Sequence, residues 1–260
     1  MYMAMDLEQM VKSGTKVMVL SDFHIPYQNN KAVQIAMDFA KDYKPDKIVL
    51  NGDMIDFYGI SDFDKCPDRR KNIAEEVEMT KEFLTNLRSI NKKSQIYFLE
   101  GNHENRLQKY VWRHPELHGL GALDINNMLQ LDKNHIQIVR ASNDYWGKEA
   151  GHLEVGDTVI MHGDSRINGC KGGAYAAKNT AINIAKPVIM GHTHRLSEYN
   201  VTNRYNDLKG VECGCLCQIP KLANWQNGFV TFETIKGKNH NYRLHRIEKN
   251  MLIESKKIYK

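Results

Sequence analysis

The run QIYFLEGNHENR, residues 95–106, passes from an apolar, strand-like segment directly into a glycine, an amide, an imidazole and a carboxylate. Glycine and asparagine tolerate positive φ and often close strands, so the stretch taken alone is consistent with a turn. Four other apolar runs end in polar residues in the same way. They are residues 16–22, 46–53, 157–164 and 186–192. A single functional site built from the ends of all five runs would explain this recurrence.

The spacing of the runs predicts an α/β fold. Helical periodicity separates them near residues 29–43, 72–90, 104–113 and 173–185, which is the pattern of β-α units stacked around a buried sheet. After Arg195 the chain turns to alternating, β-rich stretches. We expect these later strands to form a second sheet against the first, giving a four-layer sandwich of two mixed β-sheets packed face to face and flanked by helices. In the least regular part, residues 114–156, we expect a short helix near 121–130 and a hairpin reaching Val155.

The composition indicates one domain that spans residues 1–260, with residues 1–14 as an N-terminal extension, because no linker divides the chain. A hydrophobic fraction of 42% and a charged fraction of 26% are ordinary for a folded soluble protein. No apolar run approaches the roughly 18 to 20 residues needed to span a bilayer, and the N-terminus has no basic leader. We therefore expect a cytoplasmic protein with no membrane association. The sequence does not specify an oligomeric state.

The net charge of +5 is concentrated at the C-terminal end. Residues 236–260, expected to be a basic strand or tail, contain six Lys and two Arg against two Glu, so this segment carries +6 and the first 235 residues about −1. Such a segment can contact the phosphates of a nucleic acid. A solvated surface is the commoner explanation.

Five cysteines, an odd number, make a poor disulfide framework, so reduced thiols are expected. Cys213, Cys215 and Cys217 alternate and would share one face of a strand. A zinc site is the alternative, but thiolate zinc sites usually have two-residue gaps and a second ligand cluster. Burial as small apolar residues is favoured.

Each of the five runs ends in residues that can bind metal ions. In an open α/β sheet the ligand crevice lies beyond the carboxyl ends of the strands, so these side chains should gather at one edge. They are Asp22, His24, Asp53, Asp56, Asn102, His103, His162, His192 and His194. Carboxylate, imidazole and amide ligands suit divalent ions, manganese first among them and otherwise Fe, Zn or Ni, and there are more ligands than one ion can use. Two ions are therefore expected, and such a pair can hold a hydroxide that attacks phosphorus.

The order DFH, GDMID, GNHE, HGD and GHTH over about residues 16–195 resembles the motif pattern of the calcineurin-like metallophosphoesterases. The resemblance implies a first metal held by Asp22, His24, Asp53 and His194. It implies a second metal held by Asp53, Asn102, His162 and His192, with Asp53 as the bridge. His103 would then protonate the leaving oxygen, and Asp56 would orient and charge its ring.

The Ser/Thr protein phosphatases of this family carry an arginine directly after the second Asp of GDxxD, where this chain has Phe57. That departure argues against a protein phosphatase of this branch. Arg106, Arg166 and Arg195 each follow a motif closely, and we expect them to bind the substrate phosphate. The glycine-rich stretch at residues 163–173 is either a substrate loop or merely a flexible one.

These observations favour a phosphoesterase that uses a metal-bridging hydroxide and prefers phosphodiesters of nucleotides or nucleic acid. A phosphomonoesterase, acting on a protein or a small molecule, is the alternative. A scaffold that kept the fold and lost catalysis is a third possibility, although such proteins usually lack some of the ligands and this chain has all of them.

Overall fold

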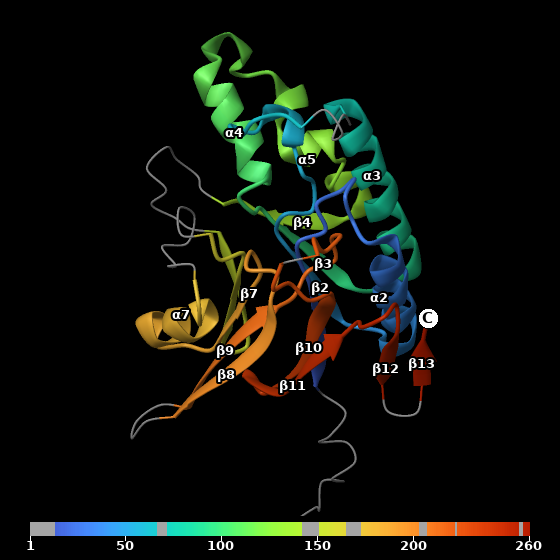
Figure 1. Cartoon of the computed structure of the whole chain (residues 1–260), viewed down its shortest axis with the longest axis vertical. Helices are drawn as coiled ribbons and strands as arrows, with labels where there is room; N and C mark the ends of the chain where they lie inside the picture. Colours follow the sequence, from blue (N-terminus) through green and yellow to red (C-terminus); the bar gives the residue numbers. More distant parts are fainter. Residues whose placement is uncertain are drawn as a thin grey trace, which may run out of the picture.

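Two mixed sheets form the centre of the computed structural model, which describes residues 14–66, 72–141, 151–164, 173–202, 207–221, 223–254 and 257–260 (Figure 1). The first sheet has the strand order β11-β10-β1-β2-β3-β4. Its strands are β1 (Thr15–Leu20), β2 (Lys47–Asn51), β3 (Gln95–Leu99), β4 (Ile136–Val139), β10 (Gly228–Ile235) and β11 (Lys238–Arg246). The second sheet has the order β5-β6-β7-β9-β8. Its strands are β5 (His152–Val155), β6 (Thr158–Met161), β7 (Val188–Met190), β8 (Leu196–Thr202) and β9 (Asp207–Cys213).

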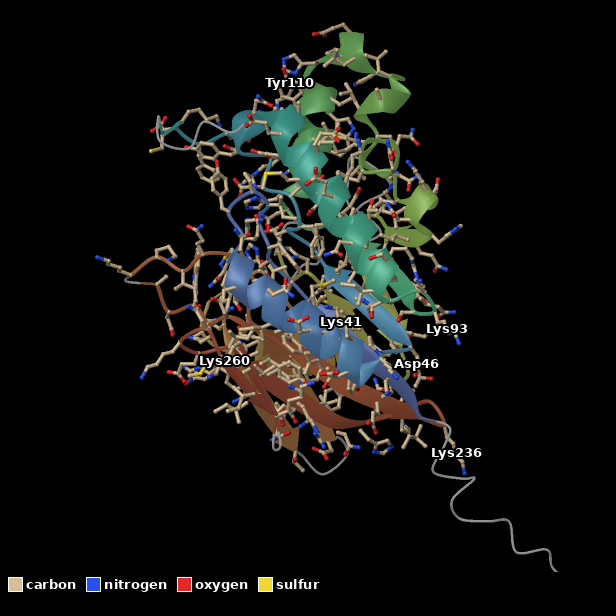
Figure 2. The ribbon with its side chains drawn as sticks, turned by 90° about the vertical axis from the view of Figure 1, so that its right-hand side faces the viewer. Lys41, Asp46, Lys93, Tyr110, Lys236 and Lys260 are labelled. Carbon is tan, nitrogen blue, oxygen red and sulfur yellow. The ribbon has the colours of Figure 1, made fainter. Side chains whose placement is uncertain are left out.

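Helices cover the two outer faces. Helices α2 (Asn30–Tyr43) and α3 (Ile73–Ile90) lie side by side over the first sheet, as Figure 2 shows, and α7 (Ala176–Ile184) packs on the second. Strand β1 shows why the layers form, because its side chains alternate between faces. Val17 and Val19 pack between the sheets, whereas Met18 and Leu20 pack under the helices. The four-layer sandwich predicted from the sequence is confirmed.

Side chains cap the N-terminal ends of helices α2 and α3. The Asn29 side chain accepts hydrogen bonds from the backbone N–H groups of Lys31 and Ala32 at the start of α2. Asn72 and Glu75 form a reciprocal capping box at the start of α3. The other helices among the described residues are α4 (Glu104–Arg113) and α5 (Ile125–Met128), and short 3-10 turns occur at Tyr58–Ile60, Pro115–Leu117, Gly121–Leu123 and Asp132–Asn134.

The second sheet contains different strands from those that we predicted. The fourth and fifth apolar runs form β6 and β7 of the second sheet, and of the later strands only β8 and β9 join them. Strand β10 instead pairs antiparallel with β1, with Val17 opposite Phe232. The physical reason is that β10 is buried on both faces: Val230 packs between the sheets and Phe229 packs on the helix side. Such a strand can fill an interior position in the first sheet.

A hairpin does reach Val155: β5 ends there and pairs antiparallel with β6 in the second sheet, with Val155 opposite Thr158. Its second strand, β6, lies beyond the irregular segment 114–156. Strand β4, earlier in that segment, pairs in parallel with β3 in the first sheet. The expected N-terminal extension lies outside the described residues except for Gly14.

The basic C-terminal segment is folded. It forms β11 and a hairpin of β12 (Leu252–Glu254) and β13 (Lys257–Tyr259) beside α2. Several of its cations form ion pairs, including Lys238 with Asp157 and Arg243 with Glu254. Among the described residues, no helix combines the length and the apolar character needed to cross a membrane.

Candidate metal centre

The predicted metal ligands meet at one edge of the sandwich. Strands β1, β2 and β3 are parallel neighbours in the first sheet, and β6 and β7 are parallel neighbours in the second. Their carboxyl ends therefore point to a shared edge, where ligands on one sheet face ligands on the other. The ligands that follow these five strands are Asp22 and His24, Asp53, Asn102, His162, and finally His192 with His194.

The backbone at this edge is held in an unusual conformation. Asp22, His24, Asp53, His192 and His194 all have positive φ, between 49° and 63°. Non-glycine residues rarely adopt these values, which occur mainly where surrounding structure enforces them. Five such residues in one cluster indicate that the surrounding structure fixes the direction of these side chains, at a cost in stability.

Two motif glycines are required by close packing. A Cβ at Gly101 would lie 2.3 Å from Asp53 Oδ1, and a Cβ at Gly191 would lie 2.1 Å from Ser21 Oγ. Real Cβ atoms do not approach other atoms so closely, so any larger residue would displace the ligand or its support. The glycines in GNHE and GHTH thus let the two sheets bring their ligands together.

The first ligand set surrounds Asp22. Its Oδ1 lies 3.1 Å from His194 Nε2, and that nitrogen lies 3.1 Å from His24 Nε2. His24 Nε2 is in turn 3.8 Å from Asp53 Oδ2. All four side chains are buried.

The second ligand set surrounds Asn102. Its Oδ1 lies 3.0 Å from His162 Nε2 and 2.9 Å from His192 Nδ1. His162 Nε2 is 3.3 Å from Asp53 Oδ2. One oxygen of Asp53 therefore lies between the two sets, in the position expected of a bridging carboxylate.

The charges of the cluster favour bound cations. Burial opposes ionisation of Asp53, but His103 and His162 outweigh it and hold the pKa of Asp53 well below its usual value. Burial likewise disfavours the charged form of His162, yet the Asp53 carboxylate raises its pKa to about 10. Two buried carboxylates thus draw positive charge to the centre. Together with the imidazole and amide donors, they form a set that fits divalent transition-metal ions.

Asp56 connects a candidate metal ligand, His24, to the candidate acid, His103. Its Oδ1 lies 3.0 Å from His24 Nδ1 and 3.1 Å from His103 Nδ1. Burial acts against ionisation, but hydrogen bonds from these two histidines keep the pKa of Asp56 far below its usual value. Burial also lowers the pKa of His103, and the carboxylates of Asp53 and Asp56 more than reverse that effect. His103 therefore retains a proton more readily than a free imidazole.

Two of the three candidate arginines, Arg106 and Arg195, are among the described residues. Arg106 reaches the site: one guanidinium N–H donates to the Asp56 carbonyl oxygen at 2.7 Å, and another nitrogen lies 3.0 Å from His103 Nε2. Arg195 forms an ion pair with the fully buried Glu212 at 2.8 Å. Arg166 and most of the glycine-rich stretch, residues 165–172, lie outside the described residues.

Glu104 is a site residue that the sequence reasoning missed. Its carboxylate accepts four backbone hydrogen bonds, from Asp53 at 2.9 Å, Met54 at 2.7 Å, Ile55 at 3.2 Å and Gly101 at 2.8 Å. It thereby ties the loop after β2 to the loop after β3. The signal was present in the last letter of GNHE, because an acidic residue in the first turn of a helix can accept such bonds.

A cavity of about 540 Å³ opens beside the candidate metal ligands, five of which line it: His24, Asp53, Asn102, His192 and His194. Its other lining residues are Tyr27, Asp56, His103, Cys217, Gln218, Pro220 and Trp225. Cys217 is buried as expected, together with Cys213 and Cys215, but its sulfur also lies 3.9 Å from His194 Nδ1. The cavity therefore combines a charged floor with a partly aromatic side.

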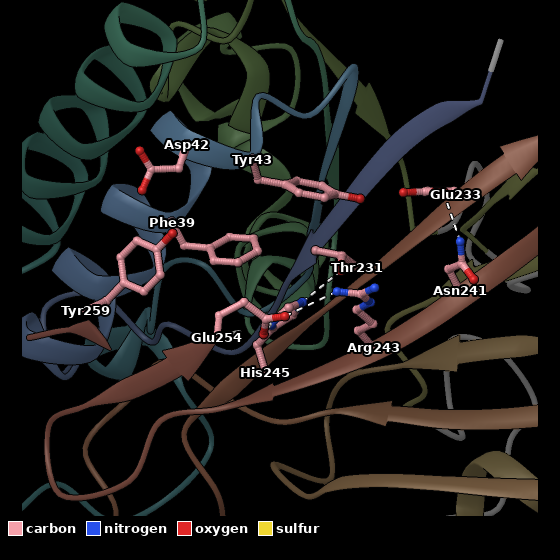
Figure 3. Close-up of a pocket in the computed structure, with 10 residues that line it drawn as sticks. All are labelled: Phe39, Asp42, Tyr43, Thr231, Glu233, Asn241, Arg243, His245, Glu254 and Tyr259. Atoms are coloured by element: carbon pink, nitrogen blue, oxygen red, sulfur yellow. Dashed lines mark hydrogen bonds and ion pairs between the residues drawn. The ribbon is translucent and has the colours of Figure 1, made fainter. Parts of the chain in front are cut away.

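A second hollow of about 260 Å³ lies between α2, β10, β11 and the C-terminal hairpin (Figure 3). Several of its polar side chains pair with one another. His245 lies 2.7 Å from Thr231 Oγ1 and 3.0 Å from Glu254, and Asn241 donates to Glu233. Among the described residues no group of metal ligands lies there, so we assign the chemistry to the larger cavity.

Comparisons with known proteins give one matching family model and several similar proteins. A family model described as calcineurin-like phosphoesterase matches residues 15–196. The Gene 54 protein of Mycobacterium phage L5 is 25% identical over 242 residues, which cover 86% of this chain and 90% of that protein. Among solved structures, a Vps29 variant from Entamoeba histolytica has 13% identity and a TM-score of 0.45, covering 92% of this chain and 96% of its own. YfcE, a phosphoesterase from E. coli, has 15% identity and a TM-score of 0.39, covering 88% of this chain and 98% of its own.

Proposed function

The chain belongs to the calcineurin-like phosphoesterase family, and from this premise we propose that it is a two-metal phosphodiesterase acting on nucleotides or nucleic acid. The observation that carries the proposal is the position of Asp53, whose Oδ2 lies 3.3 Å from a nitrogen of one ligand set and 3.8 Å from a nitrogen of the other. A carboxylate between two ligand sets can bridge a pair of divalent ions, which lie about 3.5–4 Å apart in two-metal sites.

The residues suit direct hydrolysis. Divalent ions in the two sets would neutralise phosphate oxygens and lower the pKa of the attacking water toward about 7. As the bond from phosphorus to the ester oxygen breaks, His103 donates its proton to that oxygen, while Asp56 holds the opposite side of the ring at 3.1 Å. Arg106, whose guanidinium lies 3.0 Å from His103 Nε2, is placed to donate to a phosphate oxygen at the same spot.

The preference for diesters is supported by Phe57. This residue occupies the position where the protein-phosphatase branch carries its phosphate-binding arginine. Its side chain is fully buried and belongs to the core under the helices. No cation is therefore available at that position to bind the dianion of a phosphomonoester. The described cysteines are free thiols, which supports a cytoplasmic location for the enzyme.

The test is a substrate panel on manganese-loaded protein. Bis(4-nitrophenyl) phosphate and 4-nitrophenyl phosphate share a leaving group and differ only in the second ester, and single- and double-stranded DNA and RNA extend the panel. We expect hydrolysis of the diester and of at least one nucleic acid. Turnover of the monoester alone would identify a phosphomonoesterase. Inactivity on every substrate, with two ions bound, would identify a non-catalytic scaffold.

A further inference from the structure

The side of the active cavity next to the first ligand set is aromatic. Trp225 packs edge to face on His194, with ring centroids 4.0 Å apart and planes at 73°. Tyr27 and Pro220 line the same cavity. Neither Tyr27 nor Trp225 is a candidate metal ligand, and the Trp225 side chain is only half-buried. We call Tyr27, Pro220 and Trp225 the aromatic wall.

The wall is held in place by backbone hydrogen bonds from segments far apart in the chain. The Gln226 N–H donates to the His194 carbonyl at 2.9 Å, which fixes the chain next to Trp225. The Gln218 N–H donates to the Tyr27 carbonyl at 2.9 Å. Asn227 adds a side-chain bond to the Cys217 carbonyl at 2.8 Å. Because the segments that carry the wall are anchored in this way, their backbone loses little conformational freedom when a ligand packs on the wall.

From this arrangement we propose that the aromatic wall binds a planar heteroaromatic ring, so that the substrate is a nucleobase-bearing phosphate ester. This inference rests on the proposed function and adds the recognition element that chooses the substrate. Trp225 contacts His194, a candidate metal ligand. A ring stacked on the wall would therefore be separated from the phosphate position only by that histidine. Aromatic side chains stack on every base, so the wall selects for a base without selecting its identity.

The volume and the chemistry of the cavity agree with this assignment. At about 540 Å³ the cavity is larger than a phosphate group needs and lies in the range of small-molecule sites. A small alkyl or sugar ester would leave the wall exposed to water. A nucleoside ester would cover it while its phosphate reaches the metal ligands.

The first experiment measures binding with a matched ligand pair. AMP and ribose 5-phosphate carry the same phosphate and sugar, and only AMP carries a base. The chain has three tryptophans, so replacing Trp112 and Trp146 by Phe leaves Trp225 as the single reporter. We expect AMP to quench its fluorescence and to bind manganese-loaded protein at least about tenfold more tightly than ribose 5-phosphate, as base stacking predicts. Chromatography of the recovered ligand verifies that it stays intact during the titration.

The second experiment removes the wall, and because Trp225 is itself the fluorescent reporter, both affinities are measured here by calorimetric titration. Trp225→Ala should bring the two affinities within about twofold of each other, Trp225→Phe should keep most of the difference, and Trp112→Ala is the control outside the cavity. If Trp225→Ala does not fold, Tyr27→Ala is measured instead and should reduce the same ratio. Equal affinities in the wild type, or an unchanged ratio in the folded variants, would overturn the inference.

Two further arms identify the source of the base and separate the two proposals. Tighter binding of a deoxyadenosine trinucleotide than of AMP would assign the wall to single-stranded nucleic acid, and equal affinity would assign it to mononucleotides. Both results support a base on the wall. AMP binding at Trp225 without hydrolysis of any ester would contradict the proposed function alone, whereas hydrolysis without a preference for a base would contradict this inference alone.

Discussion

Asp56 Oδ1 lies 3.1 Å from His103 Nδ1. This contact fixes one nitrogen of the imidazole, and the other, Nε2, lies 3.6 Å from Asp53 Oδ2 and 3.0 Å from a guanidinium nitrogen of Arg106 at the floor of the cavity. A histidine held by a carboxylate on one side, with its other nitrogen facing the site, is a usual arrangement of a general acid. We therefore propose that His103 delivers its proton where the leaving oxygen departs.

His103→Ala should lower kcat by about 10²- to 10⁴-fold, the usual contribution of a general acid. The loss should be larger for an alkyl leaving group than for 4-nitrophenol, because a good leaving group needs little protonation. Bound metal should be unchanged, since His103 lies outside both proposed ligand sets. Steady-state kinetics and elemental analysis of the same samples check this.

The control is His118→Ala, which removes an exposed imidazole beyond α4. It should leave both kcat and the amount of bound metal unchanged. Loss of metal from His103→Ala would show that His103 is a ligand. An equal loss of rate for both leaving groups would argue against proton donation.

Glu104→Gln tests the support beneath Asp53. The amide keeps the shape of the carboxylate but replaces one accepting oxygen with an NH₂ group, which faces two backbone N–H donors. Hydrogen bonds to charged groups contribute about 1.5–3 kcal/mol each. We expect Tm to fall by roughly 5–10 °C and metal affinity by about 10- to 100-fold. Calorimetry and metal titration measure these, with the exposed Glu82→Gln as control; a Glu104→Gln protein that matches the control would contradict the supporting role.

Glu76 gives a pH-dependent prediction for stability. It is fully buried on α3, and burial, with a further contribution from Asp56, raises its pKa to about 7. The pKa of Glu76 is higher in the folded state than in the unfolded state. The protonated, neutral form of Glu76 therefore stabilises the folded state fully below about pH 4.5, and this stabilisation is lost as the pH rises through 7. Glu76→Gln should therefore be more stable than the wild type at pH 8, by about 1–3 kcal/mol, and close to it at pH 5.

Thermal unfolding at the two pH values, at fixed metal loading, checks this prediction. Glu82→Gln on the exposed face of the same helix should show no such difference. A Glu76→Gln protein whose gain is equal at pH 5 and pH 8 would show that ionisation of Glu76 is not the cause.

The parts of the fold predicted from sequence are those with local physical causes. The helix beginning after Asn72 follows from a capping box within four residues. The meeting of Asp53 and Asn102 follows from two parallel strands that end side by side. In both cases a short stretch contains the whole determinant.

The parts that sequence could not supply depend on contacts between distant segments. The alternating pattern of β10 suits either sheet, and its pairing with β1 is decided by packing on both faces. The ion pair between Arg195 and Glu212 depends on the register of β8 and β9. Tyr27 and Trp225 line one cavity although no motif relates them.

The measurement that tests the central claim most directly is the number of divalent ions bound per chain, determined by elemental analysis in the wild type and in Asp53→Ala. The account predicts two ions in the active wild-type protein, loss of both in Asp53→Ala, and no change in the exposed control Asp64→Ala. Fewer than two ions in active protein, or two ions retained in Asp53→Ala, would contradict it.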